Sequence, residues 1–361
     1  MKKITYIFNQ GRTNLQNNLD YSDDFFYGYR YLTKKNFTTE IIEFSNKFTI
    51  LKKIEHLLSK YLSLPFYIFS LLTLNNYKSI KNSDHIILIS ESSGFAVLPL
   101  LIFLKKSKRP TSHLFIMGLY SKKINYSYLK FLHKFFIRTL HKYIDNFYIL
   151  GKGELLEANR YKKLNNNILF SPFCIDTNFW TNDSKMNGEY ILFIGNDGNR
   201  DYELLYEIAK GMQQFKFKII SNNEYFNNKN LHNIEVFNSR WGDGKITDRD
   251  LINFYKSAKL VILPLKNTSQ PSGQSVALQS LSIGVPVIIS KIEGFWDINK
   301  FQDGVNIFFE DKNTIESWIN KINMTIYDLD KIKKTTNAGR KLVVENYDIE
   351  NFNKFLLKKI K

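Results

Sequence analysis

The sequence is poor in several features that would place a protein in a special class. Among 361 residues it has one cysteine, Cys174, which excludes an internal disulfide and is compatible with a reducing compartment. Its longest apolar runs, Leu62–Leu74 and Gly94–Leu104, fall short of the roughly 20 residues that span a bilayer. Seven prolines and seventeen glycines leave no room for a long disordered tail. The composition therefore predicts a globular chain with room for two domains.

Acidic residues are scarce in the first half of the chain. Up to Thr181 there are 26 Lys and Arg against 12 Asp and Glu, whereas the remainder has 25 against 22. A codon bias toward lysine would act evenly along the chain, so this asymmetry needs a cause of its own. Residues 48–74 and 121–144 interleave basic residues with Leu, Tyr and Phe at helical spacing, which suits an anionic membrane surface. A core helix with a solvated basic face is the alternative for each stretch.

Apolar β-branched runs alternate with helical patterns from end to end. The first series predicts strands at residues 4–9, 38–45, 85–92, 112–119 and 147–152, and the second at residues 189–196, 215–221, 233–238, 259–265 and 285–290. Two successive β-α-β series predict an α/β fold class with two Rossmann-like, doubly wound domains facing a central cleft. The polar residues 181–188 form the expected linker, and a ligand is expected between the domains.

Several segments of the second half carry a family resemblance. QPSGQSVALQSLSIGVPVI (residues 270–288), PFCIDTNFW (residues 172–180) and DGVNIFF (residues 303–309) are similar to the E-x7-E segment with its GxPVI, the domain-junction segment and the DGxNGxL turn of GT-B glycosyltransferases, in particular the retaining family 4. The match covers about residues 172–347, and the first half matches in architecture alone. The resemblance implies a GT-B fold with an acceptor-binding domain at residues 1–180, a donor-binding domain at 181–347 and a helix at 348–361 that crosses back.

The turn before the helix that starts near Gln274 has a physical use of its own. Gly273 lets a ligand approach the backbone closely, and the helix directs its free N–H groups and positive dipole end at the same place. An anion suits this position, and a diphosphate fits best. An ordinary helix cap is the alternative. The expected donor-binding residues are Gly195, Arg240, Trp241, Gln270, Ser272, Gly273, Gln274, Ser275 and Gln279.

The resemblance also implies individual roles and shows where this chain departs from the pattern. Gln279 stands at the second glutamate of E-x7-E, which holds the nucleotide ribose in the family. The first glutamate, which touches the donor sugar, falls at Pro271, with Gln270 as its nearest polar neighbour. Arg240 and Trp241 lie where the base-binding loop is expected. The loss of both glutamates leaves the identity of the sugar open.

Two basic residues are candidates to neutralise the leaving diphosphate. Arg200 follows the first strand of the second series, and Lys266 follows the fourth, so both are predicted catalytic residues, with a solvated loop charge as the alternative. Asp-x-Asp occurs at Asp248 and at Asp328, but neither follows a strand into the cleft. We interpret these acids as capping or surface residues and expect no metal and no cofactor.

Acceptor-side candidates come from the ends of the first strands. Gly11 and Arg12 follow the first strand, and Glu91 and Ser93 follow the third, where helix capping is the alternative. Asp24 is a further candidate, although Asp23 and Asp24 at the start of a helix are first interpreted as capping.

Together these features predict a retaining, metal-independent glycosyltransferase that uses a nucleotide-diphosphate sugar. Its expected acceptor is a glycan or lipid-linked molecule of cell-surface polysaccharide biosynthesis, at the cytoplasmic face of an anionic membrane. Alternatives are a GT-B sugar-nucleotide epimerase, which needs paired carboxylates in the cleft, and a non-catalytic relative that binds a nucleotide or glycan. No helix-turn-helix, zinc-finger or RNP pattern accompanies the basic charge, so no nucleic-acid partner is expected.

Overall fold

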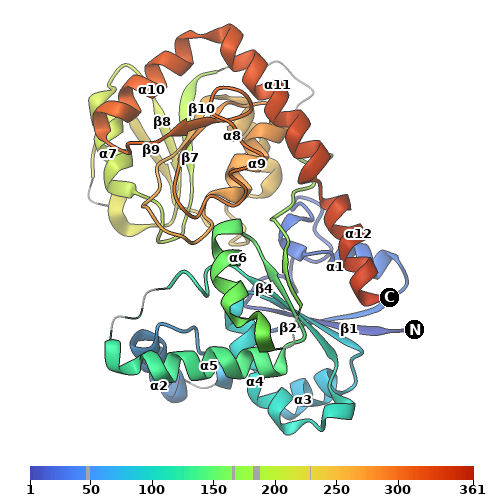
Figure 1. Cartoon of the computed structure of the whole chain (residues 1–361). Coiled ribbons are helices and arrows are strands. Elements are labelled where there is room, and N and C mark those ends of the chain that lie inside the picture. The colour runs from blue at the N-terminus through green and yellow to red at the C-terminus, as the bar shows by residue number, and fades with distance from the viewer. Residues whose placement is uncertain (46–48, 123, 125, 165–166, 182–187, 228) are drawn as a thin grey trace.

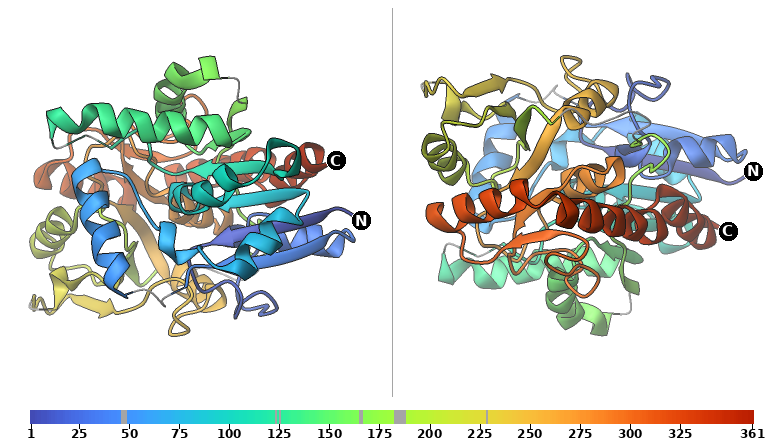
Figure 2. Two further views of the ribbon diagram at one scale, coloured as in Figure 1. Left: turned by 90° about the horizontal axis from the view of Figure 1, so that it is seen from below. Right: turned by 90° about the horizontal axis from the view of Figure 1, so that it is seen from above.

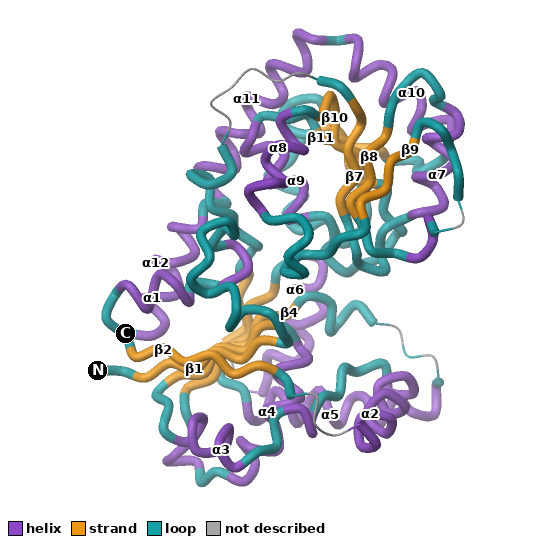
Figure 3. The backbone as a smooth tube through the Cα atoms, turned by 180° about the vertical axis from the view of Figure 1, so that it is seen from behind, coloured by secondary structure: helices purple, strands orange, loops and turns teal. Residues whose placement is uncertain are grey.

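The computed structural model describes residues 1–361 except 46–48, 123, 125, 165–166, 182–187 and 228. It contains two six-stranded parallel sheets, one above the other in Figure 1. The strand orders are β2-β1-β3-β4-β5-β6 and β12-β11-β10-β7-β8-β9. Each sheet is flanked by helices, so the predicted fold class of two Rossmann-like domains is confirmed (Figure 3). The predicted linker, residues 181–188, lies mostly outside the described residues.

The strands are short, and the inner ones are almost fully buried, as expected for parallel sheets covered on both faces, whereas the edge strands β2, β6 and β9 are partly exposed. The first sheet comprises β1 (Lys3–Phe8), β2 (Thr38–Glu43), β3 (His85–Ile89), β4 (Thr111–Ile116), β5 (Asn146–Ile149) and β6 (Asn167–Phe170). The second comprises β7 (Tyr190–Ile194), β8 (Phe217–Ile220), β9 (Ile234–Phe237), β10 (Ala258–Leu263), β11 (Val287–Ser290) and β12 (Phe308–Glu310).

Helices connect the strands and close the chain. They are α1 (Tyr29–Lys34), α2 (Thr49–Leu62), α3 (Leu74–Lys81), α4 (Glu91–Phe103), α5 (Lys130–Tyr143), α6 (Lys152–Ala158), α7 (Tyr202–Gly211), α8 (Asp248–Lys256), α9 (Gln274–Ile283), α10 (Ile315–Tyr327), α11 (Leu329–Asn346) and α12 (Ile349–Ile360). Within the described part of the chain, every helix is too short or too polar to cross a bilayer.

The sequence did not predict β6 and β12, the last strand at one edge of each sheet. β6 has four residues after an asparagine-rich stretch, and β12 has three residues, the first two of which belong to the segment interpreted as a turn. Both are too short to show the periodicity of a strand. Conversely, the predicted strands 85–92 and 112–119 end earlier, at Ile89 and Ile116, because α4 already begins at Glu91 and because residues 117–119 form a turn at the carboxyl edge of the sheet.

Three apolar clusters hold these layers together. One packs α3, α4 and α5 against one face of the first sheet, and another packs α7 and α10 against one face of the second. The third is continuous across both domains and includes α1, α8, α9 and α12. α11 and α12 follow one another along the side of both domains (Figure 2). α12 ends beside β1, where Lys2 Nζ donates to the Ile360 carbonyl at 2.7 Å.

Candidate functional site

Helix α9 begins in a glycine turn without a side-chain cap. Gly273 is the N-cap residue, with φ +78°, and no side chain caps its helix. A side chain there would be strained by the left-handed backbone, and its Cβ would lie 2.9 Å from Ile289 Cδ1. The helix ends at Gly284, also left-handed with φ +92°. The first N–H groups of α9 and its positive dipole end therefore point to the space beside Gly273, which suits an anion.

The guanidinium of Arg200 lies beside this turn. Its side chain is 4% exposed, and its closest acidic contact is a distant one, 3.6 Å from Nη2 to Asp197. Nε and Nη1 are buried, and no described residue forms a hydrogen bond with either atom. A Cβ added at Gly273 would lie 3.4 Å from Nη1. Because buried polar groups in proteins are nearly always hydrogen-bonded, these donors make the place beside Gly273 suitable for an anionic ligand.

Gly195 makes room for this arginine. It follows β7 directly, and a Cβ added there would lie only 2.1 Å from Arg200 Nε. The backbone of Arg200 is fixed by a bridge to Leu265, just after β10. The guanidinium is thus placed by two neighbouring strand ends, and only glycine at position 195 permits this placement.

A cavity of about 250 Å³ lies against Arg200 and the α9 turn, at the carboxyl ends of β7 and β8. We call it the first cavity. Its lining residues are Phe25, Ile194, Gly195, Asn196, Asp197, Arg200, Ile220, Ser239, Arg240, Trp241, Ile246, Asp248, Leu251, Ser275, Val276 and Gln279. Six of the predicted site residues meet here: Gly195, Arg200, Arg240, Trp241, Ser275 and Gln279. All lining residues except Phe25 come from the second half of the chain.

Gln279 reaches this cavity with both ends of its amide already engaged. Tyr255 donates its hydroxyl proton to Oε1 at 3.1 Å, and Nε2 donates to Asp24 Oδ2 at 3.3 Å. The residue is 3% exposed. Gln279 therefore ties α9 to the first domain, and its contact with a ribose remains a prediction.

The capping interpretation of Asp23 and Asp24 is wrong. Asp23 makes no capping hydrogen bond, and the short 3-10 helix Asp24–Phe26 buries the Asp24 carboxylate at the domain junction. Its oxygens accept hydrogen bonds from the Asp176 amide at 2.7 Å and from Trp180 Nε1 at 2.6 Å. Burial raises the pKa of Asp24 to about 8, although these hydrogen bonds oppose the shift. The side chain lines a small cavity of about 10 Å³ at the domain junction and neither the first cavity nor the second cavity described below, so its contact with an acceptor stays a prediction.

The surface interpretation of Asp248 is also wrong, and sequence reasoning missed this residue. Asp250, with Thr247, forms the capping box of α8, which leaves Asp248 to turn inward. It is 1% exposed, lines the first cavity and accepts hydrogen bonds from the amide and hydroxyl of Ser22 across the domain interface. Burial raises its pKa to about 6. In the T-D-R-D sequence both acids fit a capping pattern, so the sequence offered no signal to separate them.

Other donor candidates lie near the first cavity without lining it. Gln270 spans the cleft, because its Nε2 donates to the Met117 carbonyl at 2.8 Å and its side chain fills the space over Gly118. Ser272 accepts a hydrogen bond from Asn199 Nδ2 at 2.8 Å. Gln274 is buried, with Oε1 unpartnered. These contacts stiffen the turn around Gly273.

The remaining candidates Lys266, Glu91 and Ser93 lie outside the lining of the first cavity. Lys266 is exposed and does not line the first cavity. Glu91 is buried and accepts from the Met117 amide at 3.2 Å, and the Ser93 hydroxyl donates to the Ser90 carbonyl. Both side chains are therefore engaged within the first domain, and their contact with an acceptor stays a prediction.

Gly11 and Arg12 reach a second cavity, of about 490 Å³. It is lined by Asn9, Gln10, Gly11, Arg12, Phe44, Lys52, Tyr67, Ser70, Arg240, Trp241 and Gly242. Arg240 and Trp241 line both cavities, so the two are neighbours across the domain interface. Among the described residues no group of three or more His, Cys, Asp or Glu side chains could hold a metal ion.

Comparisons with known proteins agree with this architecture. The model of the family "Glycosyl transferases group 1" matches residues 175–342. A search among curated protein sequences finds no match. Among solved structures, sucrose-phosphate synthase from Thermosynechococcus elongatus is similar with a TM-score of 0.75 at 12% identity, covering 99% of this chain and 98% of that one.

Two further solved structures have the same fold. HepE from Anabaena, in complex with UDP and glucose, gives a TM-score of 0.67 at 12% identity, covering 100% of this chain and 99% of that one. A glycosyltransferase from Rickettsia africae gives 0.68 at 16% identity, covering 100% and 98%. Over residues 175–342 the chain is thus similar to the glycosyl transferases of group 1, and its two facing Rossmann-like domains have the GT-B fold of these solved structures.

Proposed function

We propose that this protein transfers a sugar from a UDP-sugar, with retention of anomeric configuration, to a glycan or lipid-linked acceptor of a cell-surface polysaccharide. The observation that carries the proposal is the buried guanidinium of Arg200, with two unpartnered N–H groups beside the N-terminus of α9. UDP is the nucleotide bound by the structurally similar HepE. A diphosphate placed between Arg200 and the α9 turn would satisfy these donors.

The proposed reaction uses these charges to stabilise the departing group. The bond between sugar C1 and the β-phosphate oxygen breaks, the acceptor oxygen bonds to C1 on the same face, and the acceptor proton passes to a phosphate oxygen of UDP. Arg200 and the dipole of α9 offset the negative charge that develops on the diphosphate. Because this positive charge is built into the protein, we expect turnover in the presence of EDTA.

A panel of UDP-sugars tests the proposal. Purified protein is incubated with UDP-glucose, UDP-galactose and UDP-N-acetylglucosamine, while UDP release, anomeric configuration by NMR and the thermal shift with UDP are recorded. We expect stabilisation by UDP and slow release of UDP from one donor with an α-configured product. Release of a free epimer would instead identify an epimerase, and UDP binding without any turnover would identify a binding protein. No stabilisation by UDP would refute the proposed nucleotide.

We further propose that the protein acts at the cytoplasmic face of an anionic membrane, held by α2 and α5. Leu57 of α2 is 53% exposed, and Phe131 and Phe135 of α5 are 75% and 53% exposed. Exposed lysines accompany them on both helices, as at Lys60 and Lys134. Exposed apolar side chains flanked by basic ones match the surface of an anionic bilayer.

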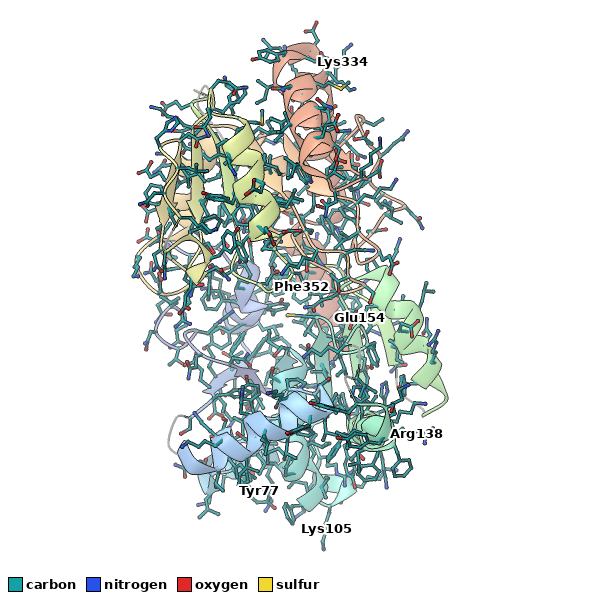
Figure 4. All side chains as sticks on the ribbon, turned by 90° about the vertical axis from the view of Figure 1, so that its left-hand side faces the viewer. Tyr77, Lys105, Arg138, Glu154, Lys334 and Phe352 are labelled. Carbon is teal, nitrogen blue, oxygen red and sulfur yellow. The ribbon has the colours of Figure 1, made fainter. Side chains whose placement is uncertain are left out.

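The two helices lie next to each other. His133 Nδ1 of α5 is 2.7 Å from the carbonyl of Leu62, and the rings of Tyr61 and Tyr126 are 5.4 Å apart. In Figure 4, α2 lies across the near side of the lower domain and ends beside α5, which carries the labelled Arg138. Cosedimentation with vesicles tests this placement: we expect binding to vesicles with 30% phosphatidylserine and little binding to pure phosphatidylcholine. Equal recovery with both would refute an anionic membrane partner.

A further inference from the structure

The second cavity is the feature that the proposed donor site leaves unexplained. It adjoins the first cavity through Arg240 and Trp241, and its other wall comes from the first domain. Its volume of about 490 Å³ is sufficient for a sugar unit with a charged substituent. In the proposed function the first cavity binds the donor. A group held in the second cavity would then lie on the side from which an acceptor approaches.

The charge of this cavity has one sign. Arg12, Lys52 and Arg240 line it, and no Asp or Glu is among its lining residues. Glu43 stands behind the wall, where its carboxylate accepts hydrogen bonds from the amides of Arg12 and Thr13. Three cationic side chains surround this space, while Glu43 acts on Arg12 and Glu55 acts on Lys52, so the balance of charge is positive and favours an anion.

Arg12 is held ready for such a ligand. Its guanidinium lies over the Trp241 ring, with Cζ 4.3 Å from the ring centroid, and Nη1 donates to the Gln10 carbonyl at 2.8 Å. Nε is buried and has no hydrogen-bond partner within the part of the chain that the structure describes. A guanidinium fixed by an indole and left with a free donor is preorganised for an oxyanion, since little side-chain entropy remains to be lost on binding.

A third cavity continues the path away from the donor. It has a volume of about 480 Å³ and shares Lys52 and Tyr67 with the second cavity. Its wall includes His56 of α2 and Lys122. The carboxylate of Glu55, also in this wall, accepts a hydrogen bond from the Phe69 amide at 2.7 Å. The three cavities therefore run in series from the donor turn to α2, the helix assigned above to the membrane.

We propose that the second cavity binds a phosphate or phosphodiester group of the acceptor, held by Arg12, Lys52 and Arg240. The inference rests on the proposed function, because it assigns the acceptor side of the same cleft. The acceptor is therefore an anionic, phosphate-bearing glycan rather than a neutral sugar. Two sources share this chemistry: a glycan on a prenyl diphosphate and a phosphodiester polymer.

Calorimetric titration of the full chain, saturated with UDP so that the first cavity is filled, tests the site. The probes are farnesyl-diphosphate-linked N-acetylglucosamine, a glycerol-phosphate trimer and, as the neutral probe, chitobiose. The variants are Lys52→Gln and Arg12→Gln, with Lys53→Gln as the matched control, because Lys53 is the next residue of α2 and lines neither the second nor the third cavity. The melting temperature and UDP affinity are recorded for each variant.

We expect at least one phosphate probe to bind well above chitobiose and Lys52→Gln to weaken it about tenfold, as for the loss of one hydrogen bond to a charged group. Arg12→Gln should weaken it further, and Lys53→Gln should leave it unchanged. Whichever phosphate probe binds tighter identifies the source. Equal affinity for chitobiose, or equal effects of Lys52→Gln and Lys53→Gln, would overturn the inference while UDP binding still supports the donor site. Absence of UDP binding would instead count against the proposed function.

Discussion

The two walls of the cleft are built on different principles. In the second domain the site depends on backbone geometry: glycines at 195 and 273, the start of α9 and one arginine fixed by two strand ends. In the first domain the wall facing the second cavity depends on residues brought together from α2 and from the segments that follow β1, β2 and α2. A backbone site tolerates few replacements and keeps a readable sequence pattern, whereas a site of dispersed side chains can change its ligand by single substitutions.

The largest expected effect concerns the charge at the donor wall. Arg200→Met should lower turnover about 10²–10³-fold, as for the loss of one preorganised group that stabilises a developing oxyanion. Donor turnover and UDP affinity are to be measured together. Arg160→Met is the control, since Arg160 is an exposed arginine of the first domain paired with Glu157. Turnover within twofold of the unmodified protein would show that the buried guanidinium serves the fold and not the reaction.

A glycine replacement tests whether the donor wall really depends on backbone space. Gly195→Ala places a Cβ where Arg200 Nε now lies, so the guanidinium must move and turnover should fall about tenfold or more. Gly198→Ala is a matched control three residues away, because a Cβ there meets nothing within 4 Å. Similar activity of the two variants would mean that the position of Arg200 is not critical.

The sequence predicts the parts of these walls that depend on local patterns, and it does not predict the parts that depend on contacts between distant residues. The α9 turn, Arg200 and the two-sheet fold were predictable, because each depends on a local pattern of glycines, strand ends and helical spacing. Asp248 and Lys52 were not assigned to a site, since their places depend on contacts with residues far away in sequence, as between Asp248 and Ser22. The capping prediction for Asp24 was wrong for the same reason. An acidic residue at the start of a helix fits a capping pattern, and only the structure shows that Trp180 and Asp176 donate hydrogen bonds to it.

A smaller effect is expected for membrane binding by α2, the helix that also contributes Lys52 to the first-domain wall. Leu57→Ser with Leu58→Ser should reduce vesicle binding several-fold, because two exposed apolar side chains of α2 no longer enter the interface. Leu329→Ser is the control, as Leu329 is 74% exposed on α11 of the second domain. Cosedimentation with anionic vesicles gives the readout, and activity on soluble substrates should stay unchanged. Equal loss in both variants would indicate that no particular face meets the membrane.

The smallest expected effect concerns the loop that closes the first-domain wall against Gln270. Glu154 Oε1 accepts a hydrogen bond from the Tyr120 amide in this loop at 2.9 Å, whereas Oε2 is buried and unpartnered. Burial, with a smaller contribution from Glu91, raises the pKa of Glu154 to about 8. The folded chain thus binds a proton here more tightly than the unfolded chain does, so stability falls as the pH rises from about 4.5 to about 8.

Glu154→Gln should remove part of this pH dependence, because its amide mimics the protonated carboxyl and keeps the acceptor for Tyr120. The melting temperature measured between pH 5 and 8 should fall less steeply in this variant, by a few degrees at the upper end, since about 1 kcal/mol shifts the melting temperature by roughly 2–4 °C in a domain of this size. Glu157→Gln on the same helix is the control, as its side chain is 39% exposed. Parallel curves for all three proteins would show that Glu154 is already ionised at pH 5, and the loop would then owe its position to Glu91 and the glycine at 118 rather than to a protonated buried acid.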